Sequence, residues 1–365
     1  MKREDGVKER GRRLGGLSRG AQILLTLACT VVIIAGLRAA ADILQPFVLS
    51  IFLAVISLPL LAWLQEYGVP RVPAVLLTLM AVIGVGGGVV ALVAGSSDTL
   101  TREAPKYQQR IETIAADIET WVVGLDIGID SLELSSFVNA DEIVDLAAGT
   151  LRGVAGVLSN TVLVLLTLTF MLFEAAGFID KIRRAFGNQV DIQRLASVLR
   201  EVQHYLAIKT LVSLATGLAV WLWMLYLGVD FPMMWGLVAF LFNYIPTLGS
   251  IFAAVPATLL AVIQMGVATA LATALGYLVI NVVVGNFIEP NLMGRRFGLS
   301  TLVVFASLVF WGWVWGPIGM LLSVPLTMIF KILMENSDEY RWVAVLLGKN
   351  SQRARLPFDL GARTP

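Results

Sequence analysis

The chain has 365 residues, of which 57% are hydrophobic and only 15% are charged, and its formal net charge is +1. Soluble domains are about one quarter charged, so this composition excludes an ordinary soluble protein and predicts a polytopic membrane protein. The small net charge does not indicate nucleic-acid binding, and the basic residues are better interpreted as topology signals. The single cysteine, Cys29, excludes an intrachain disulfide and a cysteine metal cluster.

The N-terminal tail, residues 1–20, carries seven Lys and Arg against three acids, which predicts a cytoplasmic location. The apolar run 21–37 is longer than the ~7–15 residue core of a secretory signal, so we expect a retained helix. The sequence GVGGG at 84–88 makes its span thin enough for close helix packing. Residues 21–95 form three predicted spans: 21–38, 43–64 and 72–95.

Residues 96–152 are predicted to form a small helical region outside the membrane. They hold eleven acids and only four bases. This low proportion of Lys and Arg predicts that they lie on the extracytoplasmic side. The region is too long for a plain connection. An apolar stripe at helical spacing indicates an amphipathic helix within it. The stripe consists of Ile111, Ile114, Ile118, Trp121 and Leu125.

Residues 153–334 are predicted to form a C-terminal transmembrane transport unit, so the fold class is an all-α membrane protein with about eight spans. A basic amphipathic segment, 178–205, and the charged tail, 335–365, are expected in the cytoplasm. Two of the apolar runs contain helix breaks and could each cross once or fold as a re-entrant hairpin. Charge slightly favours hairpins, because they would place Arg295 and Arg296 inside. The predicted spans are 153–177, 206–228, 233–263, 267–285 and 300–331.

The two broken runs resemble each other. Val255-Pro256 and Thr258 recur as Val324-Pro325 and Thr327, at an offset of 69 residues. Paired Gly/Pro-interrupted segments are a pointer to a transporter site, because broken helices leave backbone groups that need a cavity or protein partners. The predicted solute-binding residues are Asn243, Tyr244, Pro246, Thr247, Gly249, Asn281, Asn286, Glu289, Gly316, Pro317, Gly319 and Pro325.

Glu289 is the candidate coupling residue, because an ionisable group at membrane depth is expensive and is a functional hypothesis by default. The alternative is an interfacial carboxylate paired with Arg295 or Arg296, and Arg295 is the second coupling candidate. Asn243, Tyr244 and Thr247 could bind a polar solute or satisfy the helix break itself. Three further polar residues receive other assignments. These are Asp230 as a solvated turn residue, Glu174 as a partner of Lys181 or Arg183, and His204 as a surface or interface residue, with a pH sensor as the alternative.

Three blocks in the last ~130 residues resemble the AI-2E family of bacterial transporters, the autoinducer-2 exporter family. The match before them is architectural only. Two departures leave the substrate open: Ser300-Thr301 stands where the family usually has a proline, and tryptophans crowd the turn near Gly316. The matching residues are Ile245, Pro246, Gly249 and Pro256, then Pro290, Met293, Gly294, Arg295 and Gly298, then Gly316, Gly319, Ser323, Val324 and Pro325.

The resemblance implies a multi-pass transporter of the bacterial inner membrane, and the basic residues of both tails predict that the two termini are cytoplasmic. It also implies a homo-oligomer, with a pentamer as the expected number. Some members are linked to export of the signal autoinducer-2 and others to sodium/proton exchange, so the family name alone does not give the substrate.

The leading hypothesis is a secondary transporter that exports a small polar solute, such as an autoinducer-2-like signalling molecule, by alternating access. The alternatives are a Na⁺(Li⁺)/H⁺ antiporter and a non-transporting membrane scaffold. No Walker loop, HExxH motif or Cys/His cluster is present in the sequence, so we expect no enzyme activity, no cofactor and no metal site. The expected partners are the solute, H⁺ or Na⁺, the lipid bilayer and further copies of the chain, and not nucleic acid.

Overall fold

The computed structural model describes residues 19–123, 146, 148–150, 161–186, 192–246, 248–293, 299–335 and 341–348. Nearly all of this part of the chain is helical. The chain divides into two compact units, residues 1–45 and 46–365, and the description below concerns the second. The helices are α2 (Arg19–Ala39), α3 (Ala41–Glu66), α4 (Arg71–Val123), α7 (Thr161–Phe186), α8 (Ile192–Leu227), α9 (Pro232–Phe242), α10 (Leu248–Met265), α11 (Val267–Val283), the π-helix η3 (Val284–Ile288), α12 (Glu289–Met293), α13 (Thr301–Glu335) and α14 (Arg341–Leu347).

Six helical segments of the described chain are long and apolar enough to cross a membrane. Many of their large apolar side chains are exposed, for example Leu218 and Leu271, as expected for a surface that faces lipid. The predicted all-α polytopic fold is therefore confirmed. The six segments are 41–66, 71–96, 199–227, 248–265, 267–292 and 301–335, and shorter apolar helices cover 24–39, 161–174 and 232–242.

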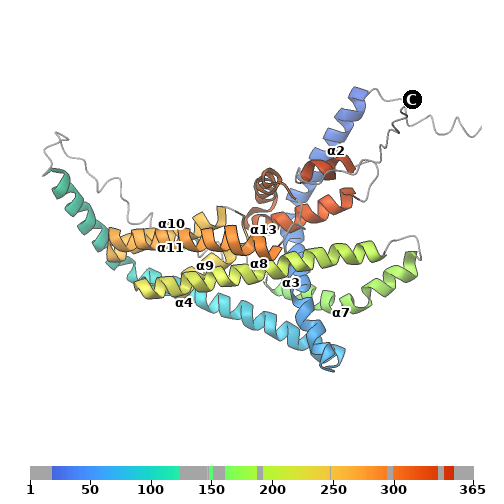
Figure 1. Ribbon diagram of the computed structural model, residues 1–365, viewed down its shortest axis with the longest axis horizontal. Coiled ribbons are helices and arrows are strands. Elements are labelled where there is room, and N and C mark those ends of the chain that lie inside the picture. Colours follow the sequence, from blue (N-terminus) through green and yellow to red (C-terminus); the bar gives the residue numbers. More distant parts are fainter. Residues whose placement is uncertain are drawn as a thin grey trace, which may run out of the picture. The chain divides into compact units, whose positions relative to one another are not determined.

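α8 is the helix that connects the buried parts of the second unit (Figure 1). Its C-terminal half packs with α9, α10, α11 and part of α4, in a cluster that includes Val220, Met224 and Trp235. Its N-terminal half packs with α3 and α13, through Tyr205 and Leu206. The expected boundary at 205/206 between an amphipathic segment and a span therefore lies inside one continuous helix of 36 residues.

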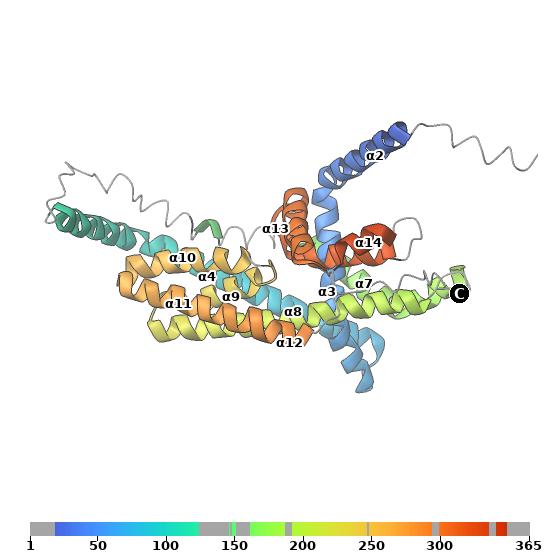
Figure 2. The same ribbon diagram turned by 45° about the horizontal axis from the view of Figure 1, so that its top comes forward.

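The stretch 232–265 forms a helical hairpin, the first hairpin, in which α9 is followed by α10. An 11-residue helix such as α9 rises only about 16 Å, about half of the ~30 Å hydrocarbon core. The two ends of the hairpin lie together, because the backbone N–H of Asp230 donates to Oε1 of Gln264 at 2.9 Å. α8 and α11 lie beside the hairpin (Figure 2). Of the two possibilities left open by the sequence, the structure favours the hairpin.

Residues 301–335 form the second hairpin within α13, which turns back at Gly316 (φ 62°, ψ −143°). This left-handed φ favours glycine, which has no Cβ to clash there. In a continuous helix Trp311 and Thr327 would lie about 24 Å apart, but Nε1 of Trp311 donates to Oγ1 of Thr327 at 3.2 Å. The two broken runs therefore share a folded-back geometry.

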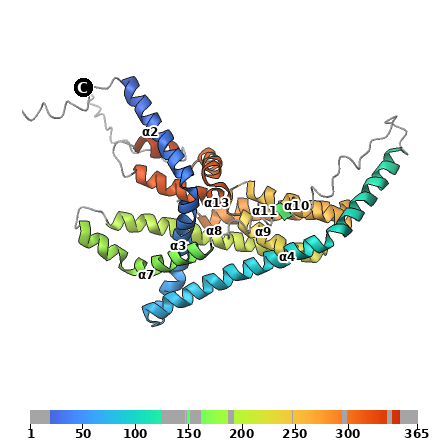
Figure 3. The same ribbon diagram turned by 180° about the vertical axis from the view of Figure 1, so that it is seen from behind.

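α4 continues without interruption through the expected boundary at 95/96, as one helix of 53 residues (Figure 3). Ile111 of the predicted apolar stripe is 4% exposed and packs with Tyr107 in the α8–α11 cluster. The side chains of Ile118, Trp121 and Leu125 lie outside the described residues. Cβ atoms added to the glycines within 84–88 would meet no described atom within 4 Å, so the described part of this chain does not make the expected close packing there.

Asp230 joins three helices at one end of the α8–α11 bundle, which we call the Asp230 end. Its Oδ2 accepts a hydrogen bond from the hydroxyl of Tyr107 on α4 at 2.8 Å. Its carbonyl accepts one from Nε1 of Trp235 on α9 at 3.1 Å, and its N–H reaches Gln264 on α10. Asp230 is a turn residue as expected, and it is partly buried, with its carboxylate and both backbone groups bonded to protein partners.

We expect Tyr107→Phe to lower the free energy of unfolding by about 1.5–3 kcal/mol, because it removes a hydrogen bond to a charged group. Burial, and then the hydrogen bond and the negative charge of Asp230, raise the pKa of Tyr107 above its usual range. Because the pKa of Tyr107 is higher in the folded state, its stabilising effect is complete below the unfolded-state pKa of about 10. The effect is lost as the pH rises above that value. Unfolding in detergent at pH 7 and above pH 10 checks this: the difference between the variant and the original chain should shrink in alkali. A constant difference would contradict it.

Candidate functional site

A buried ion pair joins α8 to the beginning of α12. Nζ of Lys209 lies 2.8 Å from Oε1 of Glu289, and the two side chains are only 5% and 22% exposed. Both residues belong to segments long and apolar enough to span a membrane. Removing two charges from water is costly, and a close pair such as this one offsets that cost only while both partners are present. The predicted carboxylate therefore has a cationic partner, Lys209, whereas Arg295 and Arg296 lie outside the described residues.

The π-helix η3 explains how Glu289 reaches the same side of its helix as Asn281. Each α-helical residue turns the chain by about 100°, so Glu289 would otherwise lie about 80° around the axis from Asn281. A π-turn contains about one extra residue, which would leave the two residues only about 20° apart. The five residues Val284–Ile288 adopt this conformation immediately before Glu289.

Hydroxyl and amide groups interlock around the tip of the first hairpin. Nδ2 of Asn243 donates to Oγ of Ser213 at 2.9 Å, and the hydroxyl of Tyr244 donates to Oγ1 of Thr210 at 2.7 Å. At the start of α10, Ser250 donates to Oδ1 of Asn281 at 2.7 Å. We call the whole set the tip network: Lys209, Thr210, Ser213, Asn243, Tyr244, Ser250, Asn281 and Glu289.

The turn that presents this network depends on close backbone contact. Tyr244 and Ile245 donate their N–H groups to the carbonyls of Leu241 and Phe242, which closes the chain before Pro246. A Cβ on Gly249 would lie only 1.8 Å from the carbonyl oxygen of Phe242. The glycine at this position therefore lets the two arms meet.

The structure brings Asn243, Tyr244, Asn281 and Glu289 together, as the sequence predicted. Asn286 is exposed on this chain. Thr247 and Arg295 lie outside the described residues. The remaining predicted residues contribute backbone geometry or packing. Pro246 and Gly249 shape the first tip, whereas Gly316, Pro317, Gly319 and Pro325 belong to the second hairpin, which packs in the other α8 cluster.

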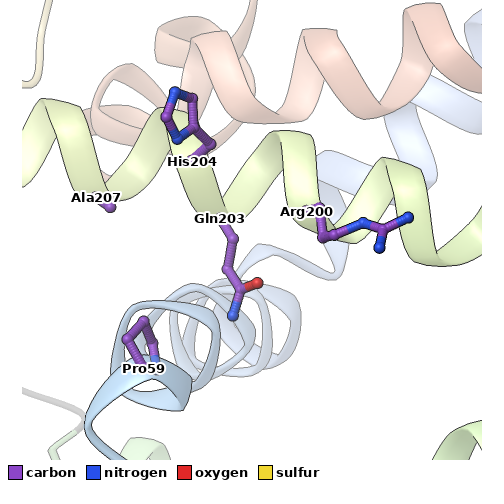
Figure 4. A pocket seen from close by; sticks show the side chains of 5 residues that line it. All are labelled: Pro59, Arg200, Gln203, His204 and Ala207. Carbon is purple, nitrogen blue, oxygen red and sulfur yellow. The ribbon is translucent and has the colours of Figure 1, made fainter. Parts of the chain in front are cut away.

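Two other polar candidates lie away from the tip network. Glu174 pairs with Lys181 at 2.5 Å, one of the two partners predicted for it, and both side chains are well exposed. His204 is exposed, as expected for a surface residue. It borders a shallow hollow of about 400 Å³ between α3 and α8, lined by Pro59, Arg200, Gln203, His204 and Ala207 (Figure 4). No member of the tip network lines this hollow, so it is not the candidate solute site.

Sequence reasoning missed the α8 half of the network. Lys209 follows the basic amphipathic segment 178–205 by only four residues, and Thr210 and Ser213 carry no charge, so none of the three was predicted as a site residue. The available signal was that Lys209 is the one charged residue between positions 202 and 229. A charge alone in a spanning segment is a functional hypothesis by default.

A helical hairpin with a polar tip, set against spanning helices, provides groups that can exchange protein partners for those of a solute. The fold and this site define a multi-pass membrane transport protein. The model of the AI-2E family transporter matches residues 27–339, and the chain belongs to this family.

Curated relatives match nearly the whole chain. "AI-2 transport protein TqsA" of Escherichia coli (strain K12) is 39% identical over 331 residues, which cover 90% of this chain and 96% of that protein. "Putative transport protein YhhT" of the same strain is 37% identical over 339 residues, covering 93% and 97%. A "Putative transport protein" of Haemophilus influenzae is 35% identical over 334 residues, covering 89% and 95%.

Proposed function

We propose that this chain is a secondary transporter that exports a small polar solute by alternating access, with the tip network as its binding site. The observation that carries the proposal is the buried Lys209–Glu289 pair beside interlocked hydroxyl and amide groups at a hairpin tip. Each of these groups has a protein partner in the present conformation. A solute with hydroxyl groups could replace those partners one for one, which keeps the desolvation cost of binding low.

Charge supports an orientation for this cycle. Five basic residues lie in 178–205, directly before Lys209, whereas the acidic region 96–152 follows the span of α4. Under the positive-inside rule the Lys209 side faces the cytoplasm and the Asp230 end faces outward. Both termini are then cytoplasmic, in a bacterial inner membrane. The first hairpin enters from the outer side, and its tip, at Ser213, lies about 21 Å along α8 from the end of that helix at Leu227.

We take autoinducer-2 as the first solute to test, because the relative TqsA is named an AI-2 transport protein. Quorum-sensing export would then be the physiological role. A homo-oligomer, a pentamer by family resemblance, would provide the fixed part against which the hairpins move. The glycines within 84–88, which meet no described atom of their own chain, are available for such contacts.

The Lys209–Glu289 pair also supports a second candidate function, a Na⁺(Li⁺)/H⁺ antiporter. The ammonium of Lys209 occupies the position beside the carboxylate that a transported cation would take. In this cycle Na⁺ would displace Lys209 from Glu289, and a proton would return on the opposite stroke.

The two functions are distinguished in proteoliposomes that contain the full chain. We expect autoinducer-2 flux above that of empty vesicles, and we expect Asn243→Ala to reduce it about tenfold, since one well-placed polar contact is worth roughly 1.4 kcal/mol. Thr78→Val is the matched control, because Thr78 is buried in α4 away from the network. Proton release driven by Na⁺ or Li⁺ without autoinducer-2 flux would instead identify the antiporter.

A further inference from the structure

Two buried hydroxyls on α11 have no hydrogen-bond partner among the described residues: Oγ1 of Thr273 and Oη of Tyr277. Thr273 is fully buried and Tyr277 is 2% exposed. Such groups are rare in folded proteins because an unpaired buried hydroxyl is costly, so each one requires an explanation.

Other buried or partly buried threonines and tyrosines show how unusual this is. Thr78, Thr210 and Thr216 each donate to the carbonyl four residues earlier in their own helix. Tyr107 and Tyr244 donate to side-chain oxygens at 2.8 and 2.7 Å. The missing partners are therefore a local property of α11, and not a general feature of hydroxyls in this fold.

The two hydroxyls lie on one face of α11 and continue the line of the tip network. Thr273, Tyr277 and Asn281 follow one another at intervals of four residues, which places them on the same side of the helix. By helical rise, Tyr277 and Thr273 lie about 6 and 12 Å from Asn281, toward the Asp230 end. The stretch from Thr273 to Glu289 thus carries polar groups over most of the membrane depth.

The elements packed on this face suit an uncharged ligand. α9, α10 and α11 contain no charged residue, and Lys209, the one charged residue between positions 202 and 229, is engaged with Glu289. α10 contains Pro256, which has no N–H and so leaves the carbonyl of Phe252 without its usual helical donor. Nε1 of Trp223 on α8 donates to the carbonyl of Ala272, and its ring lies against Gly276.

We infer that Thr273 and Tyr277 form a second subsite of the transport path, which binds the hydroxyl groups of an uncharged solute when the first hairpin moves away from α11. This inference rests on the proposed function. In the conformation described here the first hairpin covers the subsite. The hydroxyls of Thr273 and Tyr277 would form their hydrogen bonds with the solute. A solute leaving Asn281 would meet Tyr277 next and Thr273 after it.

Tyr277→Phe and Thr273→Val test this, because the inference requires stability and transport to change in different directions. Removing an unpaired hydroxyl should leave the thermal midpoint of the full chain in detergent unchanged or raise it. The same changes should reduce initial autoinducer-2 flux in proteoliposomes about threefold to tenfold each, the effect of one lost hydrogen bond. The double variant should lose more than either single variant.

Tyr107→Phe and Thr78→Val are the matched controls, since each removes a hydroxyl of α4 that has a partner within the fold. Both should lower the thermal midpoint while autoinducer-2 flux stays near that of the original chain. Unchanged flux in the Tyr277→Phe/Thr273→Val double variant would overturn the subsite and leave the proposed function in place. No autoinducer-2 flux by the original chain would overturn both. A lower midpoint in both single variants would also contradict the inference, because it would mean that the hydroxyls have partners within the fold.

Discussion

Replacing Lys209 or Glu289 alone is expected to lower the free energy of unfolding by about 3–5 kcal/mol, whereas replacing both should restore most of it. Each single change, Lys209→Met or Glu289→Gln, leaves the other charge in a site where its side chain is 5% or 22% exposed. The double variant removes both charges, so neither remains unpaired. The coupling energy measured by this double-mutant cycle should therefore be several kcal/mol.

Unfolding titrations in detergent with denaturing surfactant measure the free energy of unfolding of the original chain, the two single variants and the double variant. The matched control is the pair Lys181–Glu174, whose side chains are 67% and 50% exposed. Its coupling energy should stay below about 1 kcal/mol, because water screens an exposed pair. A coupling energy for Lys209–Glu289 as small as that of the control would show that the buried pair is not formed in the folded protein.

Transport by the double variant separates a structural role from a functional one. If the pair serves only the fold, a stable Lys209→Met/Glu289→Gln protein should export autoinducer-2 normally. The proposed role of Glu289 in coupling predicts instead that flux and its dependence on a pH gradient are lost although stability returns. Normal flux with a normal pH dependence would exclude Glu289 as the coupling residue.

The sequence was sufficient for the membrane class, the helical fold and the position of both breaks. The apolar composition indicates that the helices lie in a membrane. Proline and glycine mark where a helix cannot continue, so Pro246, Gly249 and Gly316 could be found by local rules alone. Whether each broken run crosses once or folds back depends on contacts between residues far apart in the chain. The hydrogen bond from the backbone N–H of Asp230 to the side chain of Gln264, 34 residues later, is such a contact.

The partner of Glu289 was beyond sequence reasoning for a similar reason. Arg295 and Arg296 were natural candidates because they are close in sequence, but Lys209 is 80 residues away and is brought near by the packing of α8 on α11 and α12. The π-helix that turns Glu289 toward Lys209 has no reliable sequence signature. Buried polar groups select partners by geometry in the folded chain, and separation along the sequence carries little information about it.

The glycines at the two hairpin tips lead to the second large effect. Gly249→Ala and Gly319→Ala are each expected to lower the free energy of unfolding by about 3 kcal/mol or more, the upper range for overpacking. The new Cβ would lie 1.8 Å from the carbonyl oxygen of Phe242 or 2.0 Å from that of Trp311. Both obstacles are backbone atoms, which cannot move unless the tip opens.

Two further alanine variants turn this into a graded series. At Gly312 the nearest atom is Cγ of Met320 at 2.9 Å, and a flexible methionine can move, so Gly312→Ala should cost about 1 kcal/mol. At Gly95 in α4 nothing lies within 4 Å, so Gly95→Ala should be neutral or stabilise by about 0.5–1 kcal/mol. Thermal midpoints of the four purified variants check the order. If Gly249→Ala and Gly319→Ala behaved like Gly95→Ala, the arms would not meet at these glycines. The matched breaks would then be ordinary helix kinks, and the tip network would lose the turn that presents Asn243 and Tyr244.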